Sequence, residues 1–311
     1  EKTFSKASAF CKSFYGGRMN LYKKNDDSKN LAVSFYSKQK VLCPFCKKQF
    51  AREEMLTGGG RMIAGELTDE LRRIFEPSVK FGPIYPLIYS VAACPVCHAA
   101  LLWNDFEHFS DEQIIEKVID TEDARKKSVE AVFPFYDLKR PRTVFDGAAA
   151  YYLALLCYEH LPAQYSPTIK KAQICLRLAW LCGDLNSLCP DRGFDYVQQR
   201  FYRKALFLYQ ESLDYEIHRI ENITAIGHFG PDIDKNYGYD GVIYLGALLE
   251  YRYGQKQDTE TRLKRLGMHK IALAKMFGLG KSSKNKPGPI LEHARTLYDS
   301  LKLELNETDD D

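Results

Sequence analysis

Four of the nine cysteines form two Cys-x-x-Cys pairs, Cys43-Pro-Phe-Cys46 and Cys94-Pro-Val-Cys97. A Cys-x-x-Cys turn directs two thiolates at one point, so two such turns can complete a tetrahedron of sulfur ligands around zinc. Four thiolates fill every coordination position of the ion, which makes such a site structural. We therefore predict one structural Zn²⁺ per chain, with Cys43, Cys46, Cys94 and Cys97 as its ligands.

Three alternatives for these cysteines remain open. One Cys-x-x-Cys pair can perform thioredoxin-like redox chemistry when it lies between a strand and a helix. Cys94 to His98 also fits the haem-attachment pattern Cys-x-x-Cys-His, although that pattern leaves the other pair without a role. Finally, His98 or Cys11 can replace one of the four ligands. The flanks 40–42 and 90–93 are predicted to be matching strands, which favours the two-turn zinc site.

The remaining cysteines occur singly, mostly in apolar and helix-like surroundings, where a free thiol behaves as a small hydrophobe. They are Cys11, Cys157, Cys175, Cys182 and Cys189. An odd total fits poorly with a complete disulfide framework. We expect a reducing compartment, the cytoplasm.

Between Cys46 and Cys94 lie 47 residues, so the chain must leave the zinc site and return to it. Aromatic residues follow both pairs (Phe50, then Trp103 and Phe106) and are expected to form an apolar lid over the ion. Within the insert, 51–93, a loop is predicted at Gly58–Arg61 and a short helix at 67–75. The glycines beside Arg61 can cradle a phosphate or simply form a hinge.

The second half of the chain has helical periodicity throughout. An exposed helix is expected over 111–132, with Asp111 as its N-cap, followed by a proline-containing linker and a domain boundary near 140. Helices are then predicted at 146–161, 168–182, 194–217, 239–253, 259–277 and from 290 onward. Leu178-Ala179 with Cys182, followed by Tyr202 and Ala205, fits a tetratricopeptide-like hairpin loosely.

The predicted fold class is α+β, mainly α: a small four-Cys zinc-ribbon-like module with an insert, followed by TPR-like α-helical hairpin repeats. The predicted segments are a basic N-terminal arm at 1–40, the zinc-ribbon-like module at 41–140, the helical domain at 141–305 and an acidic tail at 306–311.

Charge and composition are those of a globular protein. The chain has 311 residues, a formal charge of +3 and 45% hydrophobic residues, and it has no apolar run long enough to span a membrane. Eleven basic residues against three acidic ones fall within residues 1–48. This arm can contact an acidic partner or a membrane surface, or it can be a solvated terminus. A second basic stretch at 261–291 can contact an acidic partner or nucleic acid, or it can be a solvated helix face.

The sequence contains no convincing set of catalytic residues. Two segments resemble known ligand-binding motifs but lack residues that those motifs require. Asp232, Asp234 and Asn236 resemble the start of a calcium loop, but the required glycine and closing glutamate are missing. Gly280-Lys281-Ser282 resembles the end of a phosphate-binding loop without its first glycine. The seven histidines are scattered. An enzyme with an open metal site, or with a ligand at Gly58–Arg61, remains a weaker alternative.

The two cysteine pairs, Phe50, Asp105-Phe106 and the segment Leu176 to Leu181 resemble, in order, a bacterial family of unknown function (domain of unknown function twenty-two twenty-five). The glycine-rich insert resembles spirochaete versions. The resemblance implies a zinc-binding module fused to tetratricopeptide-like helices, no assigned reaction, and Cys43, Cys46, Cys94 and Cys97 as metal ligands.

We interpret the chain as a non-enzymatic adaptor or scaffold that is stabilised by zinc and binds a protein or peptide on its helical surface. Aromatic residues that recur in the helices are candidate anchors for such a partner. The alternative is a nucleic-acid-binding zinc-ribbon protein that uses the basic arm.

Overall fold

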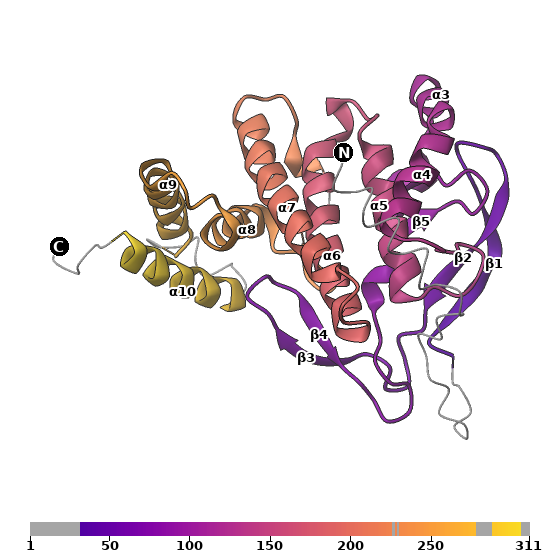
Figure 1. The fold of residues 1–311 in the computed structure, drawn as a ribbon, viewed down its shortest axis with the longest axis horizontal. Helices are drawn as coiled ribbons and strands as arrows, with labels where there is room; N and C mark the ends of the chain where they lie inside the picture. Colours follow the sequence, from indigo (N-terminus) through magenta and orange to yellow (C-terminus); the bar gives the residue numbers. More distant parts are fainter. Residues whose placement is uncertain (1–31, 226–227, 229, 278–287, 306–311) are drawn as a thin grey trace. The chain divides into compact units, whose positions relative to one another are not determined.

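The computed structural model describes residues 32–225, 228, 230–277 and 288–305, and the chain divides into two compact units (Figure 1). Each unit is discontinuous in sequence and is described by itself. The metal-cluster unit contains the described residues of 1–63, 77–157 and 184–192, and the helical unit contains those of 64–76, 158–183 and 193–311. The predicted fold class is confirmed: the structure is α+β, mainly helical, with the four cysteines near the N-terminal strands. The predicted domain boundaries stay a prediction.

Two short antiparallel hairpins form the β part of the metal-cluster unit. Strands β1 (Ser34–Leu42) and β2 (Gln49–Met55) pair with a register irregularity between Tyr36 and Lys40. Strands β5 (Val91–Ala93) and β6 (Ala100–Leu102) form the second hairpin. The turn of each hairpin contains one Cys-x-x-Cys pair, so the strands predicted before both pairs are confirmed. Residues 34–40 of the predicted basic arm belong to β1, and residues 1–31 lie outside the described residues.

The helices of the metal-cluster unit follow its second hairpin. They are the 3-10 turn η1 (Pro86–Tyr89) and the helices α2 (Trp103–His108), α3 (Glu112–Asp120), α4 (Glu122–Val132) and α5 (Val144–Tyr158). Asp111 caps α3 as predicted, because its side chain accepts a hydrogen bond from the Ile114 amide at 3.2 Å. The single helix expected over 111–132 is wrong, since the chain breaks at Thr121 between α3 and α4.

The helical unit begins with a hairpin that was predicted to be a helix. Strands β3 (Ile63–Leu67) and β4 (Arg73–Glu76) pair through a turn in which Leu71 has a positive φ of 60°. The apolar spacing of residues 67–75 is compatible with a helix. Side chains that reach Glu70 from three helices of the unit hold this segment as a hairpin instead.

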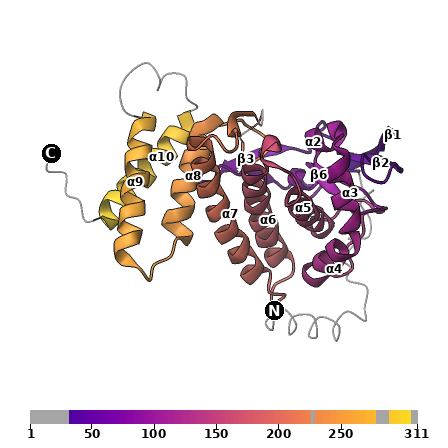
Figure 2. The ribbon, with the colours of Figure 1, turned by 90° about the horizontal axis from the view of Figure 1, so that it is seen from above.

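The helices of this unit lie close to their predicted positions. They are α6 (Pro167–Leu188), α7 (Phe194–Ile217), α8 (Gly238–Tyr253), α9 (Thr259–Phe277) and α10 (Gly288–Glu304), with 3-10 turns η2 (Ala163–Tyr165) and η3 (Ile223–Ala225). Residues 184–188 of α6 belong to the metal-cluster unit. Helices α8, α9 and α10 are neighbours in both views (Figures 1 and 2). Antiparallel helical packing is therefore present, whereas the tetratricopeptide assignment stays a prediction.

Glycine 246 lies where α8 contacts α7. A methyl group added there would meet Leu213 of α7 at 3.6 Å, an ordinary van der Waals distance. The unit's interior is formed mainly by α6, α7 and α8, whose inward residues include Leu178, Tyr209 and Tyr244. Among the described residues, no helix has the length and apolar character needed to cross a membrane.

Gly147 of α5 provides a test of the packing in the metal-cluster unit. A Cβ at this position would lie 2.5 Å from Cβ of Ile88 in η1, which is too close for any side chain. We expect Gly147→Ala to lower the free energy of unfolding by about 1–3 kcal/mol through overpacking.

Gly267 of α9 is the matched control, because a Cβ there meets nothing within 4 Å. Gly267→Ala should raise the free energy of unfolding by about 0.5–1 kcal/mol, since alanine favours the helix. Denaturant unfolding of both variants is the measurement. Equal effects of the same sign would contradict the packing described for α5.

Candidate metal centre

The first cysteine turn connects β1 to β2. The Cys43 amide donates a hydrogen bond to the Lys48 carbonyl at 2.9 Å, and the Lys47 amide donates to the Cys43 carbonyl at 3.0 Å. Lys47, directly after the second cysteine, takes a left-handed conformation with φ 58°. These bonds curl the backbone so that the side chains of Cys43 and Cys46 point to the same side.

The second cysteine turn repeats this geometry between β5 and β6. The Cys94 amide donates to the Ala99 carbonyl at 2.9 Å, and the His98 amide donates to the Cys94 carbonyl at 3.0 Å. His98 takes the left-handed conformation with φ 54°, as Lys47 does. The two turns therefore have the same backbone hydrogen bonds and the same left-handed residue after the second cysteine.

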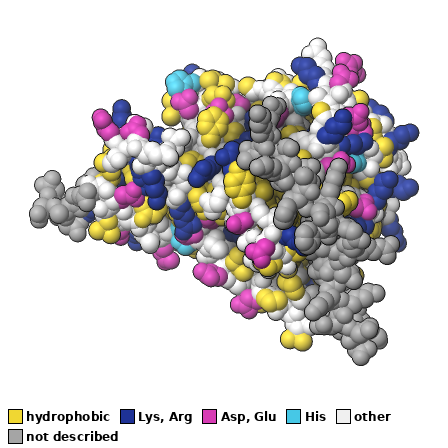
Figure 3. Space-filling model, in the orientation of Figure 1, with side chains coloured by type: hydrophobic (Ala, Val, Ile, Leu, Met, Phe, Trp, Pro, Cys, Tyr) yellow, Lys and Arg dark blue, Asp and Glu magenta, His cyan; other side chains and the backbone are white. Residues whose placement is uncertain are grey.

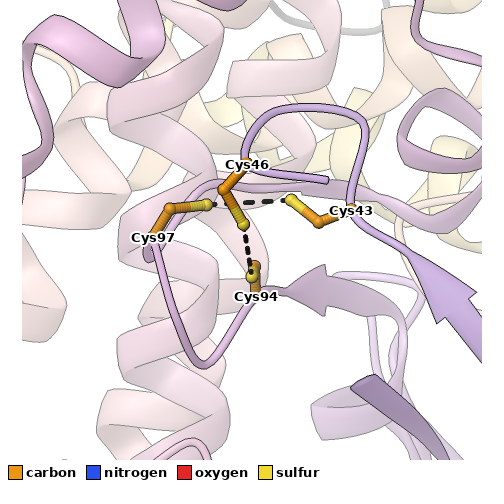
Figure 4. A group of neighbouring side chains, drawn as sticks. All are labelled: Cys43, Cys46, Cys94 and Cys97. Atoms are coloured by element: carbon orange, nitrogen blue, oxygen red, sulfur yellow. Dashed lines mark hydrogen bonds between the residues drawn. The ribbon is translucent and has the colours of Figure 1, made fainter. Parts of the chain in front are cut away.

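The four sulfur atoms meet at one point (Figure 4). Sγ of Cys43 lies 3.7 Å from Sγ of Cys97, Sγ of Cys46 lies 3.7 Å from Sγ of Cys94, and all four atoms lie within 4.8 Å of one another. A tetrahedron with Zn–S bonds of about 2.3 Å has edges of about 3.8 Å. The quartet therefore has the spacing of a tetrahedral thiolate site and can hold a metal ion.

Burial and charge both favour a cation within the quartet. Cys43, Cys94 and Cys97 are buried, and Cys46 is half-buried. Hydrogen bonds from Cys43 and Cys97 lower the pKa of Cys94 to about 2, whereas donation to Cys94 raises the pKa of Cys43 to about 12. The pKa of Cys97 is also raised, because it donates to Cys43 and Cys94. Without a cation the cluster retains protons, and a divalent ion supplies the charge that ionises all four.

Arg125 of α4 holds the second turn in place. Its guanidinium donates through Nη2 to the Cys97 carbonyl at 3.1 Å and through Nε to the His98 carbonyl at 3.3 Å. The same group donates to the carbonyl of Val118 at 2.5 Å and to the hydroxyl of Thr121 at 2.9 Å. Arg125 is only 3% exposed, so it satisfies backbone carbonyls that would otherwise be buried without partners.

The imidazole of His98 forms a hydrogen bond with Tyr136. Its Nδ1 lies 2.6 Å from the hydroxyl of Tyr136, and burial lowers the pKa of the imidazole. The group of four potential ligands contains the cysteines and not His98. Cys11, the other alternative ligand, lies outside the described residues.

Aromatic side chains cover the first turn, as the sequence led us to expect. Phe106 of α2 is fully buried and lies at the centre, with ring centroids 6.0 Å from Phe45, 5.9 Å from Phe50 and 6.2 Å from Trp103. Phe109 stacks on Phe45 at 5.4 Å. The first turn therefore contributes Phe45, which lies between its two cysteines in the chain, to a buried aromatic cluster.

Glu53 and Arg142 connect strand β2 to the residues just before α5, and no motif in the sequence indicated either of them. Glu53 of β2 accepts from the Arg142 amide at 3.0 Å and from the Ser34 hydroxyl at 2.6 Å. The Arg142 guanidinium donates to the carbonyls of Ile88 and Val91 at 2.8 and 2.7 Å, so it fastens the entry to β5. Burial lowers the pKa of Arg142, and the charge of Glu53 opposes that shift.

The glycine-rich loop offers little to a phosphate. Arg61 donates to the carbonyls of Gly58 at 2.6 Å and Ala32 at 3.1 Å, and its guanidinium lies over the ring of Phe81 at 4.3 Å. Gly59 and Gly60 both have positive φ, which explains the choice of glycine in this turn. The loop's arginine is thus occupied by the protein's own backbone and by an aromatic ring.

The false calcium motif is a polar turn in the helical unit. Asp232 accepts from the Arg73 amide at 2.7 Å, and Asp234 pairs with the Arg73 guanidinium at 3.2 Å. Both carboxylates therefore hold β4. The second failed motif, Gly280-Lys281-Ser282, lies outside the described residues.

The role of Arg125 can be tested by removing its charge. Arg125→Met preserves much of the side-chain volume but removes a guanidinium that donates to two buried carbonyls, those of Cys97 and Val118, and to two part-buried acceptors. We expect the free energy of unfolding to fall by about 2–4 kcal/mol. Lys127→Met, an exposed position on the same helix, should change it by less than about 0.5 kcal/mol. Urea unfolding at saturating zinc is the measurement, and equal stabilities of the two variants would contradict this role.

Comparison with known proteins places the chain in a family. A protein of Borreliella burgdorferi, printed as "Uncharacterized protein", is 39% identical over 274 residues, which cover 88% of this chain and 98% of that protein. No solved structure matches the chain. A family model described as "Uncharacterized protein conserved in bacteria (DUF2225)" matches residues 36–301, which include both cysteine turns and most of α10. The resemblance drawn from the motifs is confirmed, and the chain belongs to this bacterial family.

Proposed function

We propose that the chain is a non-enzymatic binding protein, in which a structural zinc ion stabilises the metal-cluster unit and the helical unit binds a protein partner. The closed sulfur quartet carries this proposal. Four thiolates around one ion leave no position for water or a substrate, which supports a structural and not a catalytic role. A tetrahedral site of four cysteine thiolates selects zinc or iron. We assign zinc to this site, in a reducing compartment such as the cytoplasm.

A cavity in the helical unit supports the binding half of the proposal. It has a volume of about 620 Å³ and lies between α7 and the connection from α8 to α9. Phe207 lines it and is 60% exposed, although phenylalanine favours burial. Exposed aromatic side chains beside a concave surface are typical anchors of protein interfaces.

Nucleic-acid binding remains the alternative, but no described feature favours it. Most of the basic arm at 1–40 lies outside the described residues, and its last part forms β1. A nucleic-acid complex should weaken steeply with salt, because each phosphate contact releases counterions.

The zinc site predicts a clear pattern of metal content. The full chain, purified under reducing conditions, should contain one zinc ion, and Cys94→Ser should lose it. Cys189→Ser, a half-buried cysteine of the same unit outside the quartet, should retain the metal. Ligation energy in such sites is folding energy, about 10–16 kcal/mol, so chelation should also unfold the metal-cluster unit.

Elemental analysis and circular dichroism measure these two effects. Zinc affinity should fall as the pH is lowered, because protons compete for the thiolates. Retention of zinc by Cys94→Ser, or one equivalent of iron in its place, would contradict the assignment.

Partner binding can be tested with a photo-crosslinking amino acid placed at Phe207 in the full chain. Irradiation in native lysate should yield a discrete adduct with a protein. Tyr196, which is 59% exposed on the same helix but does not line the cavity, is the control position. The same adducts from both positions, or none from position 207, would count against a protein-binding role for this surface.

A further inference from the structure

The walls of the helical-unit cavity are unusually polar for a binding cavity. Residues of α7, of the end of α8, of the connection from α8 to α9 and of one position on α9 form them. The lining residues are Gln199, Arg203, Leu206, Phe207, Gln210, Glu250, Arg252, Tyr253, Gly254, Gln255, Lys256, Gln257 and Arg265. Four of these are cationic, four are glutamines and one is acidic. On the face drawn in Figure 3, Lys and Arg side chains lie beside hydrophobic ones over α7 and α8.

Two of the four cations already have carboxylate partners inside the unit. Arg265 donates through Nε to Glu250 at 2.8 Å, and Gln210 donates to the other oxygen of Glu250 at 2.7 Å. Arg252 pairs with Glu70 at 3.0 Å and also with Asp69. Glu250 is 2% exposed, so the acid of the cavity wall is buried and neutralised.

The other two cations have no such partner. Arg203 on α7 and Lys256 after α8 are exposed, and neither makes a hydrogen bond or an ion pair with any residue in the described part of the chain. Both line the same cavity, Arg203 from α7 and Lys256 from the connection between α8 and α9. An anion that enters the cavity can therefore pair with both without displacing an internal carboxylate.

The rest of the lining suits a peptide. Gln199, Gln255 and Gln257 are exposed amides, which can both donate to and accept from a peptide backbone. Phe207 offers an apolar surface for one side chain. The volume of about 620 Å³ lies in the range of pockets that accept a small organic ligand, and the side chains of a bound peptide can occupy such a space.

The cavity wall is held rigid by buried contacts. Glu70, at the tip of the β3–β4 hairpin, accepts from Trp180 Nε1 at 2.5 Å and from the Tyr202 hydroxyl at 2.8 Å. Tyr202 in turn stacks on Tyr253 of the wall, with ring centroids 4.3 Å apart. A wall whose side chains are fixed before binding loses little entropy when a ligand arrives.

We propose that this cavity binds an acidic peptide segment of a protein partner, with carboxylates on Arg203 and Lys256 and an apolar side chain against Phe207. The proposal rests on the proposed function and names the chemistry of the partner. Two unpaired cations that line one cavity together with exposed amides fit a short acidic segment. A nucleic acid draws its affinity from a longer series of phosphate contacts, which this cavity does not provide.

The experiment uses the full chain with zinc bound and a short fluorescein-labelled peptide of Asp and Glu around one central Phe. Fluorescence anisotropy should show saturable binding that weakens at least tenfold in the double variant Arg203→Glu/Lys256→Glu. Phe207→Ala should weaken binding several-fold. The matched control is Lys264→Glu/Lys275→Glu, with the same charge change at two exposed positions of α9 outside the cavity, and it should bind within twofold of the wild type.

Thermal unfolding of all variants verifies that they fold, which is expected because the altered side chains are exposed. Equal weakening by both double variants would overturn the proposal in favour of general charge attraction. Undiminished binding of a peptide with Asn and Gln in place of the acids would overturn it too. So would displacement of the labelled peptide by a single-stranded oligonucleotide at lower concentration than by unlabelled peptide.

The outcome separates this inference from the function on which it rests. A protein adduct at position 207 with no affinity for the acidic peptide means that a partner binds but is not acidic at this site. In that case the proposed function stands and the inference fails. No adduct and no peptide binding would remove both.

Discussion

Four sulfur atoms that lie within 4.8 Å of one another, three from buried cysteines and one from a half-buried cysteine, cannot all be ionised unless a cation lies among them. The metal-cluster unit depends on this constraint, because its two hairpins are short and contribute little core by themselves. The surrounding chain is arranged around the same requirement. Two left-handed residues close the turns, one buried arginine satisfies the carbonyls of the second turn, and a group of aromatic rings covers the first. Each contribution is small, and an ion bound by all four thiolates would couple them, because ligation energy in such a site is folding energy.

In the described part of the helical unit, buried carboxylates are neutralised by donors from the protein itself. Glu70 and Glu250 are nearly inaccessible, yet each has at least two donors. Paired buried charges add little net stability, but removing one partner is costly, so such pairs fix the geometry of the elements that carry them. In this unit they fix the walls of the cavity between α7 and the α8–α9 connection. The rigidity of the cavity walls therefore depends on Glu250, which lines the cavity, and on Glu70, which does not.

Local patterns in the sequence predicted the elements well wherever local interactions decide the structure. The Cys-x-x-Cys spacing predicted both turns, Asp111 predicted the start of α3, and apolar periodicity predicted α7, α8 and α9. Residues 67–75 fit the helical period but form a hairpin, because Glu70 is held by side chains more than a hundred positions away. Arg125, Glu53 and Arg142 could not be identified as important for the same reason. The two arginines depend on which carbonyls lie beside them, and Glu53 depends on an amide 89 positions away, and no pattern in the neighbouring sequence indicates such partners.

The position of the β3–β4 hairpin has a consequence for biosynthesis. Residues 64–76 are made early, within the segment that separates the two cysteine turns, but they belong to the helical unit and bond to Tyr202, Tyr244 and Arg252. During synthesis, the hydrogen bonds of this hairpin to the helices can form only after most of the remaining chain has left the ribosome. A nascent chain can therefore bring its four thiols together well before the helical unit is complete. A fragment that begins near residue 140 contains the helices of the helical unit but lacks Glu70 and the β3–β4 hairpin. A fragment that ends there contains the hairpin without these helices.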